Sequence, residues 1–400
     1  MVIRRFRAEG FRNLRQTEME PCPGINVLYG ENGQGKTNCV EAIWMFTGCR
    51  SFRTGNLGEL IRHGEAKASL RTEFVSNARE QTAALALGTG GEQNRAGEAT
   101  GTAGILGAMG SKGRNGKRRE LILNGMAQDT PRRMLGVFPA VVFSPAALAM
   151  IQGGPGERRR FLDVAVSMLR PAYAVTLSKY IKALAQRNAL LRKYGKAGRA
   201  ERTQDGTELF EAWEEELAKQ AAGITLARRQ YLRELAPRAE ELYGGVSGGR
   251  EAMGISIQGG GPDEENRTAL EEAYAAQYRT SRAGDLHRQL TSVGPHREDL
   301  LLTLDGQPVR AYGSQGQQRS AALALKLAEA DVIRALSAEC PAALLDDVLS
   351  ELDGRRQTDL LRCLREWQIF LTCCEPSHLL HGKVGKAFLV AGGEIREAKG

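Results

Sequence analysis

The feature that most constrains this chain is a glycine-rich segment that matches the pattern G-x-x-x-x-G-K-[ST], namely Gly30-Glu31-Asn32-Gly33-Gln34-Gly35-Lys36-Thr37. The apolar residues 25–29 before it predict a β-strand, and apolar spacing from Asn38 to Phe46 after it predicts a helix. A strand that turns through glycines into a helix presents backbone N–H groups and a helix dipole to an anion. The alternative is a glycine-rich turn that contains Lys-Thr by chance, and the flanking elements favour a phosphate-binding loop.

A phosphate-binding loop of this kind assigns roles to its last residues. Lys36 is expected to bridge the β- and γ-phosphates of ATP and to assist catalysis, and Thr37 to bind Mg²⁺ through its hydroxyl. Asn38 completes the expected nucleotide-binding segment.

A second motif lies far downstream, where the apolar residues 341–345 run into two acids, Asp346 and Asp347. A continuous apolar run predicts a strand buried on both faces. At its end Asp346 is expected to hold Mg²⁺ and Asp347 to orient the attacking water. A simple strand-to-turn junction is the alternative, and the phosphate loop makes it the weaker one.

Length and composition limit the remaining possibilities. A chain of 400 residues exceeds one ordinary core, so two or three subdomains are expected. The net charge of +8 gives a modest bias towards polyanions. Seven cysteines without a C-x-x-C pair fit reduced thiols, and no apolar run approaches the roughly 18 residues of a membrane span, so we expect a cytoplasmic protein without membrane partners.

The pattern divides the chain into three parts: 1–150, strand-rich and containing the phosphate loop; 151–289, helical; and 290–400, containing the acidic strand end. In the first part we expect a turn near Gly10, another at Asn124-Gly125, and four strands, at Val2–Phe6, Ser69–Val75, Leu121–Leu123 and Ala140–Phe143. The stretch from Gly88 to Lys117 is predicted to be a flexible surface insertion, and the basic residues 112–119 at its end are either a solvated loop or a DNA contact.

The middle part has helical periodicity in three stretches, at Arg158–Arg170, Tyr173–Tyr194 and Leu209–Leu242. Because glycine and proline interrupt them, we expect a short antiparallel arm. Residues 244–261 are predicted to be a loop or a short strand, and 300–304 a strand followed by a turn at Asp305-Gly306.

A third motif, residues 312–320, opens a helix that is expected to run through Ala321 to Arg334. Ser314 is placed to cap this helix, which leaves free N–H groups at its N-terminus. With the two earlier motifs it resembles the ABC-type ATPases, in which a signature, here Ser314, Gly316 and Gln317, contacts the γ-phosphate held by a partner subunit. Residues 350–353 resemble the D-loop of that group, and residues 369–372 predict a further buried strand.

More specifically, the chain resembles the RecF family along essentially its full length. The resemblance rests on seven segments: Phe11-Arg12-Asn13-Leu14, residues 30–38, residues 143–145, residues 158–163, residues 294–299, residues 314–319 and residues 345–353. It implies an α/β ATPase head of the ABC/SMC type with mixed sheets and an inserted helical lid. It also implies slow ATP hydrolysis with Mg²⁺, an ATP-dependent homodimer on duplex DNA and at double-strand/single-strand junctions, and mediators of the RecO and RecR type as partners in recombinase loading at gaps.

Two other assemblies share these motifs, a transporter ATPase subunit and an SMC-like bridge. Four smaller features are left open. His296 is either structural or close to the ligands, and His378 is either a γ-phosphate sensor or a surface residue. Arg50 and Arg53 either approach the phosphates or cover the sheet. A basic N-terminal set is either a DNA-facing edge or ordinary solvated strand residues: Arg4, Arg5, Arg7, Arg12 and Arg15.

Overall fold

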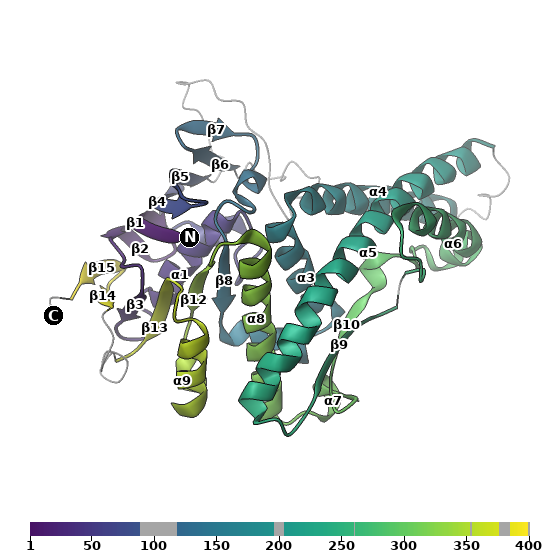
Figure 1. Ribbon diagram of the computed structural model, residues 1–400. Helices are drawn as coiled ribbons and strands as arrows, with labels where there is room; N and C mark the ends of the chain where they lie inside the picture. Colours follow the sequence, from purple (N-terminus) through teal and green to yellow (C-terminus); the bar gives the residue numbers. More distant parts are fainter. Residues whose placement is uncertain (89–117, 196–203, 260, 353, 376–384, 399–400) are drawn as a thin grey trace, which may run out of the picture.

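The computed structural model describes residues 1–88, 118–195, 204–259, 261–352, 354–375 and 385–398. The expected insertion after Gly88, most of the basic segment 112–119 and His378 therefore lie outside the described residues. Within them, two six-stranded sheets and a helical part make up the molecule (Figure 1).

The first sheet carries both nucleotide motifs and has the strand order β15-β14-β3-β13-β12-β8. Its strands are β3 (Ile25–Tyr29), β8 (Ala140–Phe143), β12 (Ala342–Leu345), β13 (Ile369–Cys373), β14 (Lys386–Ala391) and β15 (Glu394–Glu397). All neighbours are parallel except β14 and β15. The strands β12 and β8, the latter at the edge of the sheet, are buried at every residue, which explains their continuous apolar runs. The predicted strands at 25–29, 140–143, 341–345 and 369–372 are thus confirmed to within a residue or two.

The second sheet is antiparallel, with the order β2-β1-β4-β5-β6-β7. Its strands are β1 (Val2–Phe11), β2 (Leu14–Met19), β4 (Lys67–Ser76), β5 (Arg79–Gly88), β6 (Arg118–Leu123) and β7 (Met126–Gln128). The predicted turn at Asn124-Gly125 is confirmed, because both residues have positive φ and join β6 to β7 as a two-residue hairpin. The turn expected near Gly10 is confirmed two residues further on, because β1 continues to Phe11 and the chain reverses at Arg12 and Asn13.

Helix α1 (Lys36–Trp44) packs in the same apolar core as both sheets. Phe6 and Phe74 of the antiparallel sheet, Ile43 of α1 and Leu344 of the parallel sheet all belong to this one cluster. The carboxyl end of β3 and the beginning of α1 are therefore held in place by a shared core, and the glycine-rich loop joins the two.

The helical part has a second core of its own, built around α5 (Gln204–Ser247). Its other elements are α3 (Pro155–Leu169), α4 (Pro171–Gly195), α6 (Arg267–Arg288), α8 (Gln315–Ser337) and the small sheet of β9 (Met253–Gln258), β10 (Asp299–Leu304) and β11 (Gln307–Pro308). In Figure 1 this part lies beside the two sheets, and α8 runs between them. Shorter segments are α2 (Ala149–Gln152), α7 (Val309–Tyr312) and α9 (Gly354–Cys363).

The expectation that glycine and proline interrupt the helices is wrong for α5, which is continuous over 44 residues. Pro237 lies inside it at a cost of about 3 kcal/mol, which packing against α4, α6 and α8 offsets. Gly223 has a positive use, because a Cβ there would lie 3.2 Å from Cγ2 of Thr176 on α4. Glycine therefore lets the two helices approach closely. Residues 244–261 were expected to be a loop or a short strand. The structure has the end of α5 up to Ser247 there, followed by the short strand β9.

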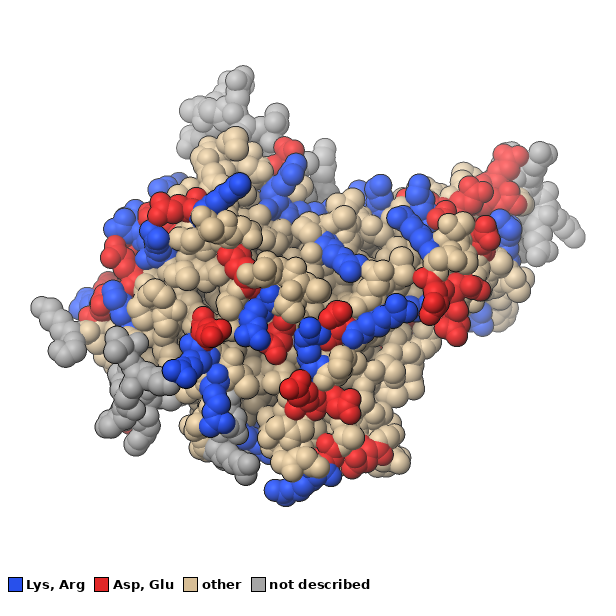
Figure 2. All heavy atoms as spheres, in the orientation of Figure 1, with Lys and Arg blue, Asp and Glu red and all other residues tan. Residues whose placement is uncertain are grey.

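Two further expectations concern the whole surface. All seven cysteines are free, which confirms the expectation of reduced thiols. None of the described helices is long and apolar enough to cross a bilayer. Figure 2 shows basic and acidic side chains interspersed on the face in view, without a purely basic region.

Candidate nucleotide-binding site

Three glycines give the loop between β3 and α1 its shape. Gly30, Gly33 and Gly35 have φ values of 146°, 79° and 122°, which side-chain-bearing residues rarely adopt. A Cβ on Gly30 would lie 2.3 Å from the carbonyl oxygen of Val390 in β14, and one on Gly35 would lie 2.7 Å from Oδ1 of Asn13. Gly30 and Gly35 are thus required both by backbone conformation and by close neighbours, and Gly33 by backbone conformation alone.

The loop closes over the side chain of Lys36. Its ammonium group donates to the carbonyl oxygens of Gly30 and Glu31, the latter at 2.9 Å, and lies 3.9 Å from Sγ of Cys374. The side chain of Asn32 also lies beside Cys374, because its Oδ1 is 3.4 Å from the same sulfur. The ammonium is therefore held at the centre of the loop, where a phosphate bound by the loop would meet it.

The two motifs predicted to bind Mg²⁺ meet at a hydrogen bond. Thr37 Oγ1 donates to Oδ1 of Asp346 over 2.8 Å, although the two residues are 309 positions apart. Thr372, on the neighbouring strand β13, donates to the same oxygen at 3.1 Å. A hydroxyl and a carboxylate side by side are oxygen ligands of the kind that Mg²⁺ prefers, so these residues fit the ion.

Burial raises the pKa of the Asp346 carboxyl, while the hydrogen bonds from Thr37 and Thr372 oppose that rise. A bound divalent cation would favour the charged form further. Asp347 has a φ of 54°, which turns the chain sharply at the end of β12. Its backbone N–H donates to Thr372 Oγ1 at 2.8 Å, and its carboxylate accepts from Ser350 at 2.9 Å.

The other residues of the expected segment anchor the loop. Gln34 accepts at its Oε1 from the N–H of Gly392, at 2.7 Å, in the turn between β14 and β15. Asn38 donates to Asn13 over 2.7 Å, and Asn13 in turn donates to the carbonyl of Gly33 over 3.0 Å. The tip of the β1–β2 hairpin and the β14–β15 turn therefore fix the two sides of the loop.

A buried glutamate, which the sequence analysis did not single out, organises the helix behind the loop. Glu41 is fully buried on α1, and its carboxylate accepts hydrogen bonds from Nε and Nη2 of Arg12, each at 2.9 Å. Arg53 adds an ion pair at 3.3 Å and also donates to Asn38 at 2.7 Å, and Ser51 donates to the other carboxylate oxygen. The available signal was an acid among the apolar positions of the predicted helix, together with Arg12 in the segment 11–14.

The predicted signature residues lie at the start of α8. Ser314 accepts from the backbone of Gln317, whose side chain accepts from the backbone N–H of Ser314, so the predicted cap is a complete capping box. Gln317 also donates to Glu251 at 2.7 Å. Ser314 is exposed, Gly316 and Gln317 are half-buried, and none of these hydrogen bonds reaches Lys36, Thr37 or Asp346.

Three open alternatives now have a geometric answer. His296 donates from Nε2 to the backbone carbonyl of Thr291 at 3.1 Å, and its Nδ1 is hydrogen-bonded to the Tyr180 hydroxyl at 2.6 Å. Burial lowers its pKa to about 4, so its surroundings are structural. Arg53 lies beside the loop helix through Asn38. Three of the N-terminal arginines form exposed pairs with glutamates, Arg4 with Glu80 and Arg5 and Arg7 with Glu18, which favours solvated strand residues. Arg12 differs, because it lies in the turn after β1 and pairs with the buried Glu41.

Comparison with protein families gives a match over almost the whole chain. The model of the RecF/RecN/SMC N terminal domain matches residues 2–384. The DNA replication and repair protein RecF of Heliobacterium modesticaldum is 37% identical over 391 residues, which cover 97% of this chain and 96% of that protein. The RecF protein of Acidothermus cellulolyticus is 35% identical over 368 residues, or 91% of each chain.

Solved structures agree with the sequence comparison. Two solved structures of the recombination mediator protein RecF in the RecFOR pathway, RecF-ATP and RecF-ATPrS, are each 30% identical to this chain, with a TM-score of 0.83. The match covers 98% of each of those chains. It covers 100% of this chain for RecF-ATP and 99% for RecF-ATPrS. The Smc head domain of Pyrococcus furiosus is similar in fold alone. It is 16% identical, with a TM-score of 0.52, and the match covers 99% of this chain and 96% of that one. The expected α/β ATPase head with mixed sheets is confirmed.

Proposed function

Because this chain belongs to the RecF family, we propose that it serves recombinational repair and DNA replication as an ATPase that closes on DNA when it binds Mg-ATP. The observation that carries the proposal is the 2.8 Å contact between Thr37 and Asp346 beside the Lys36 ammonium. Two motifs far apart in the sequence supply, at one place, the cation and the oxygen ligands that a Mg-nucleotide requires. The similarity to RecF-ATP over the full chain supports the same ligand.

In the proposed site the glycine-rich loop holds the β- and γ-phosphates. Lys36 neutralises the charge that develops on them, and Thr37 and Asp346 would hold Mg²⁺, which stabilises the leaving phosphate oxygens. Asp347, at the turn after β12, would orient the attacking water. The Glu41 and Asn13 contacts keep the loop rigid, which is how a protein contributes to phosphoryl transfer.

The separation of the signature from the loop supports a composite site. Ser314 is exposed at the start of α8, Gly316 and Gln317 are half-buried beside it, and a second copy related by two-fold symmetry would place the three on the γ-phosphate. ATP would then favour the dimer, because only the dimer makes both sets of phosphate contacts. Hydrolysis would release it.

We extend the proposal to the remaining expectations. The parts 1–150 and 290–400 would form the ATPase head and 151–289 the helical lid. The net charge of +8 supports duplex DNA and double-strand/single-strand junctions as ligands, with slow, DNA-stimulated hydrolysis and salt-dependent binding. Mediators of the RecO and RecR type would be its partners in the cytoplasm. A transporter subunit or an SMC-like bridge is less well supported, because the RecF proteins match over the full chain.

Light scattering coupled to size-exclusion chromatography tests the proposal, with no nucleotide, ADP or ATP, each with and without duplex DNA. We expect a dimer with ATP alone and a more stable dimer when duplex is added. Lys36→Met and Ser314→Arg should both stay monomeric, because one removes the phosphate contact and the other blocks the signature. Ser337→Arg, at the exposed opposite end of α8, is the matched control and should dimerise. A monomer under every condition would overturn the composite site.

A further inference from the structure

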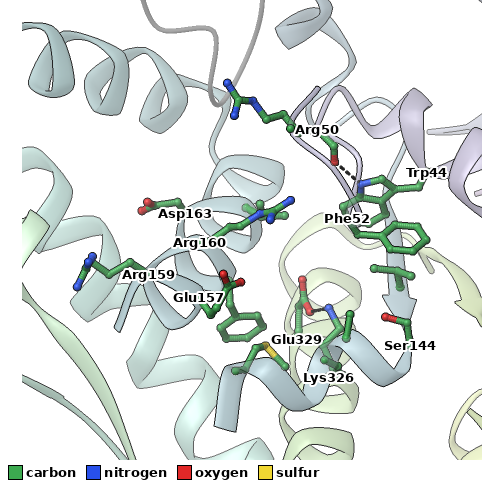
Figure 3. A pocket seen from close by; sticks show the side chains of 18 of the residues that line it. Trp44, Arg50, Phe52, Ser144, Glu157, Arg159, Arg160, Asp163, Lys326 and Glu329 are labelled. Carbon is green, nitrogen blue, oxygen red and sulfur yellow. Dashed lines mark hydrogen bonds and ion pairs between the residues drawn. The ribbon is translucent and has the colours of Figure 1, made fainter. Parts of the chain in front are cut away.

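A cavity of about 620 Å³ is lined by residues of the sheet part and of the helical part. Figure 3 shows the side chains that line it. Trp44 of α1 and Phe52 line one side, and their rings meet edge to face with centroids 6.3 Å apart. Phe161 of α3 with Leu177 and Ile181 of α4 line the other side. The size is that of pockets which bind small molecules, and the lining is mostly apolar with a few polar groups, as such pockets require.

Two arginines at this cavity have no carboxylate partner in the described part of the chain. Arg160 of α3 donates to the carbonyl of Ser51 at 2.7 Å, while the Arg50 guanidinium makes no hydrogen bond or ion pair there. Burial and the nearby charge of Arg160 lower the pKa of Arg50. Both arginines line the same cavity and carry like charges, so an anion bound in the cavity would offset their repulsion.

A third arginine adds to the positive field. Arg119 of β6 is only 7% exposed, and its Nε has no hydrogen-bond partner. Within the described residues its guanidinium donates to the carbonyl of Cys49, next to Arg50 in the chain, at 3.5 Å. Burial and the charge of Arg50 lower the pKa of Arg119 to about 10. Of the three arginines only Arg119 is buried, while Arg50 is half-buried and Arg160 exposed. A buried guanidinium without a counter-ion is costly, and an anion bound beside Arg50 would offset that cost for Arg119, which does not itself line the cavity.

Most other charges that line the cavity are already neutralised. Lys326 and Glu329 form an ion pair with each other on α8, and Asp163 accepts from Arg228 at 2.7 Å. Arg159 donates to the carbonyl of Glu298 and points away from Arg160 in Figure 3. Of the polar lining residues, Glu157 and Ser144 remain, and both are suited to hydrogen bonds with polar edges of a ligand.

We propose that this cavity binds a nucleoside monophosphate unit, with its phosphate between Arg50 and Arg160 and its base among Trp44, Phe52 and Phe161. Guanidinium groups suit a phosphate, and aromatic side chains suit a flat base. The amino and imino groups of a base would find acceptors in Glu157 and Ser144. The unit comes either from a free nucleotide or from a nucleic-acid strand. This site is separate from the phosphate loop, because none of residues 30–38 lines the cavity.

Isothermal titration calorimetry of the full chain with AMP and with CMP tests the proposal directly. We expect one saturable site per chain for at least one of the two, with a dissociation constant below about 1 mM. Arg50→Met and Arg160→Met should each weaken binding by about 10- to 100-fold, the usual effect of losing a hydrogen bond to a charged group. Thermal melting of each variant establishes that it is folded.

Two controls separate this site from the phosphate loop and from general charge effects. Lys36→Met should lose ATP binding and keep binding of the monophosphate. Lys179→Met removes a positive charge from the side of α4 that faces away from the cavity, since Lys179 lies about 200° around the helix from Leu177. This variant should bind the monophosphate with unchanged affinity. The proposal is overturned if neither monophosphate binds, if both arginine variants bind normally, or if Lys36→Met abolishes binding.

A competition arm identifies the source of the ligand. Bound AMP or CMP is challenged with a single-stranded oligonucleotide. Displacement that is lost in Arg160→Met assigns the site to a nucleotide within a strand, and failure to displace assigns it to the free nucleotide. Because these titrations contain no ATP, they can fail or succeed independently of the proposed ATP-driven dimer.

Discussion

The buried carboxylate of Glu41 gives the sharpest test of how the phosphate loop is held. Glu41 is fully buried and carries a bidentate ion pair with Arg12, which is itself only 16% exposed. The substitution Glu41→Gln keeps the shape and removes the charge, so the Arg12 guanidinium is left buried without its counter-ion. Breaking a buried pair in this way costs about 3–5 kcal/mol.

This cost converts into a measurable change in melting temperature. With an unfolding entropy of about 2.1 cal/mol/K per residue, a chain of 400 residues that melts as one unit should lose about 4–6 °C. Differential scanning calorimetry of the apoprotein measures it. Glu80→Gln is the control, since its pair with Arg4 is exposed (61% and 78%) and should be worth less than about 1 kcal/mol. If Glu41→Gln melts within about 1 °C of the wild type, the network does not support the loop as described.

Three further predictions concern single residues. Gly30→Ala should abolish binding of a fluorescent ATP analogue, because its Cβ would lie 2.3 Å from a carbonyl oxygen, whereas Gly33→Ala, with open space around it, should cost only about 1–2 kcal/mol of backbone strain. Thr37→Val should remove the Mg²⁺ dependence of ATP affinity, measured with and without EDTA, while affinity without the metal stays within about 3-fold. Because the pKa of His296 is lowered to about 4 in the folded protein, the unfolded chain binds a proton more easily. The free energy of unfolding should therefore fall by up to about 3 kcal/mol as the pH drops from about 6.5 to 4. In His296→Gln the midpoint of urea unfolding should depend less steeply on pH over that range.

The sequence predicted the elements whose cause is local. The Asn124-Gly125 turn follows from two residues that tolerate positive φ, and the cap of α8 follows from Ser314 and Gln317 three positions apart. The strand β12 follows from an apolar run that only a fully buried strand explains. In each case the residues that decide the structure are neighbours in the chain.

Features set by distant residues were missed. The continuity of α5 depends on its contacts with α4, α6 and α8, which outweigh the local penalty of Pro237. The partners Arg12 and Glu41 are 29 positions apart, and nothing in either segment alone indicates the ion pair. The cavity brings together Arg50 and Arg160 from different parts of the fold, so its charge is visible only in three dimensions.

The same distinction bears on the mechanism. A single chain brings Lys36, Thr37 and Asp346 together because the loop that leads to the first two follows β3 and Asp346 follows β12, and both strands lie beside β13 in one parallel sheet. Ser314 starts a helix whose capping box and contact with Glu251 are satisfied within the helical part, and no bond draws it towards the loop. A site that is rigid in two separate halves needs no refolding when it closes, because two copies have only to dock. In the proposed dimer, the signature of one copy would contact only the γ-phosphate of the ATP that the other copy binds. The dimer would then form with ATP and not with ADP, as a nucleotide-gated clamp requires.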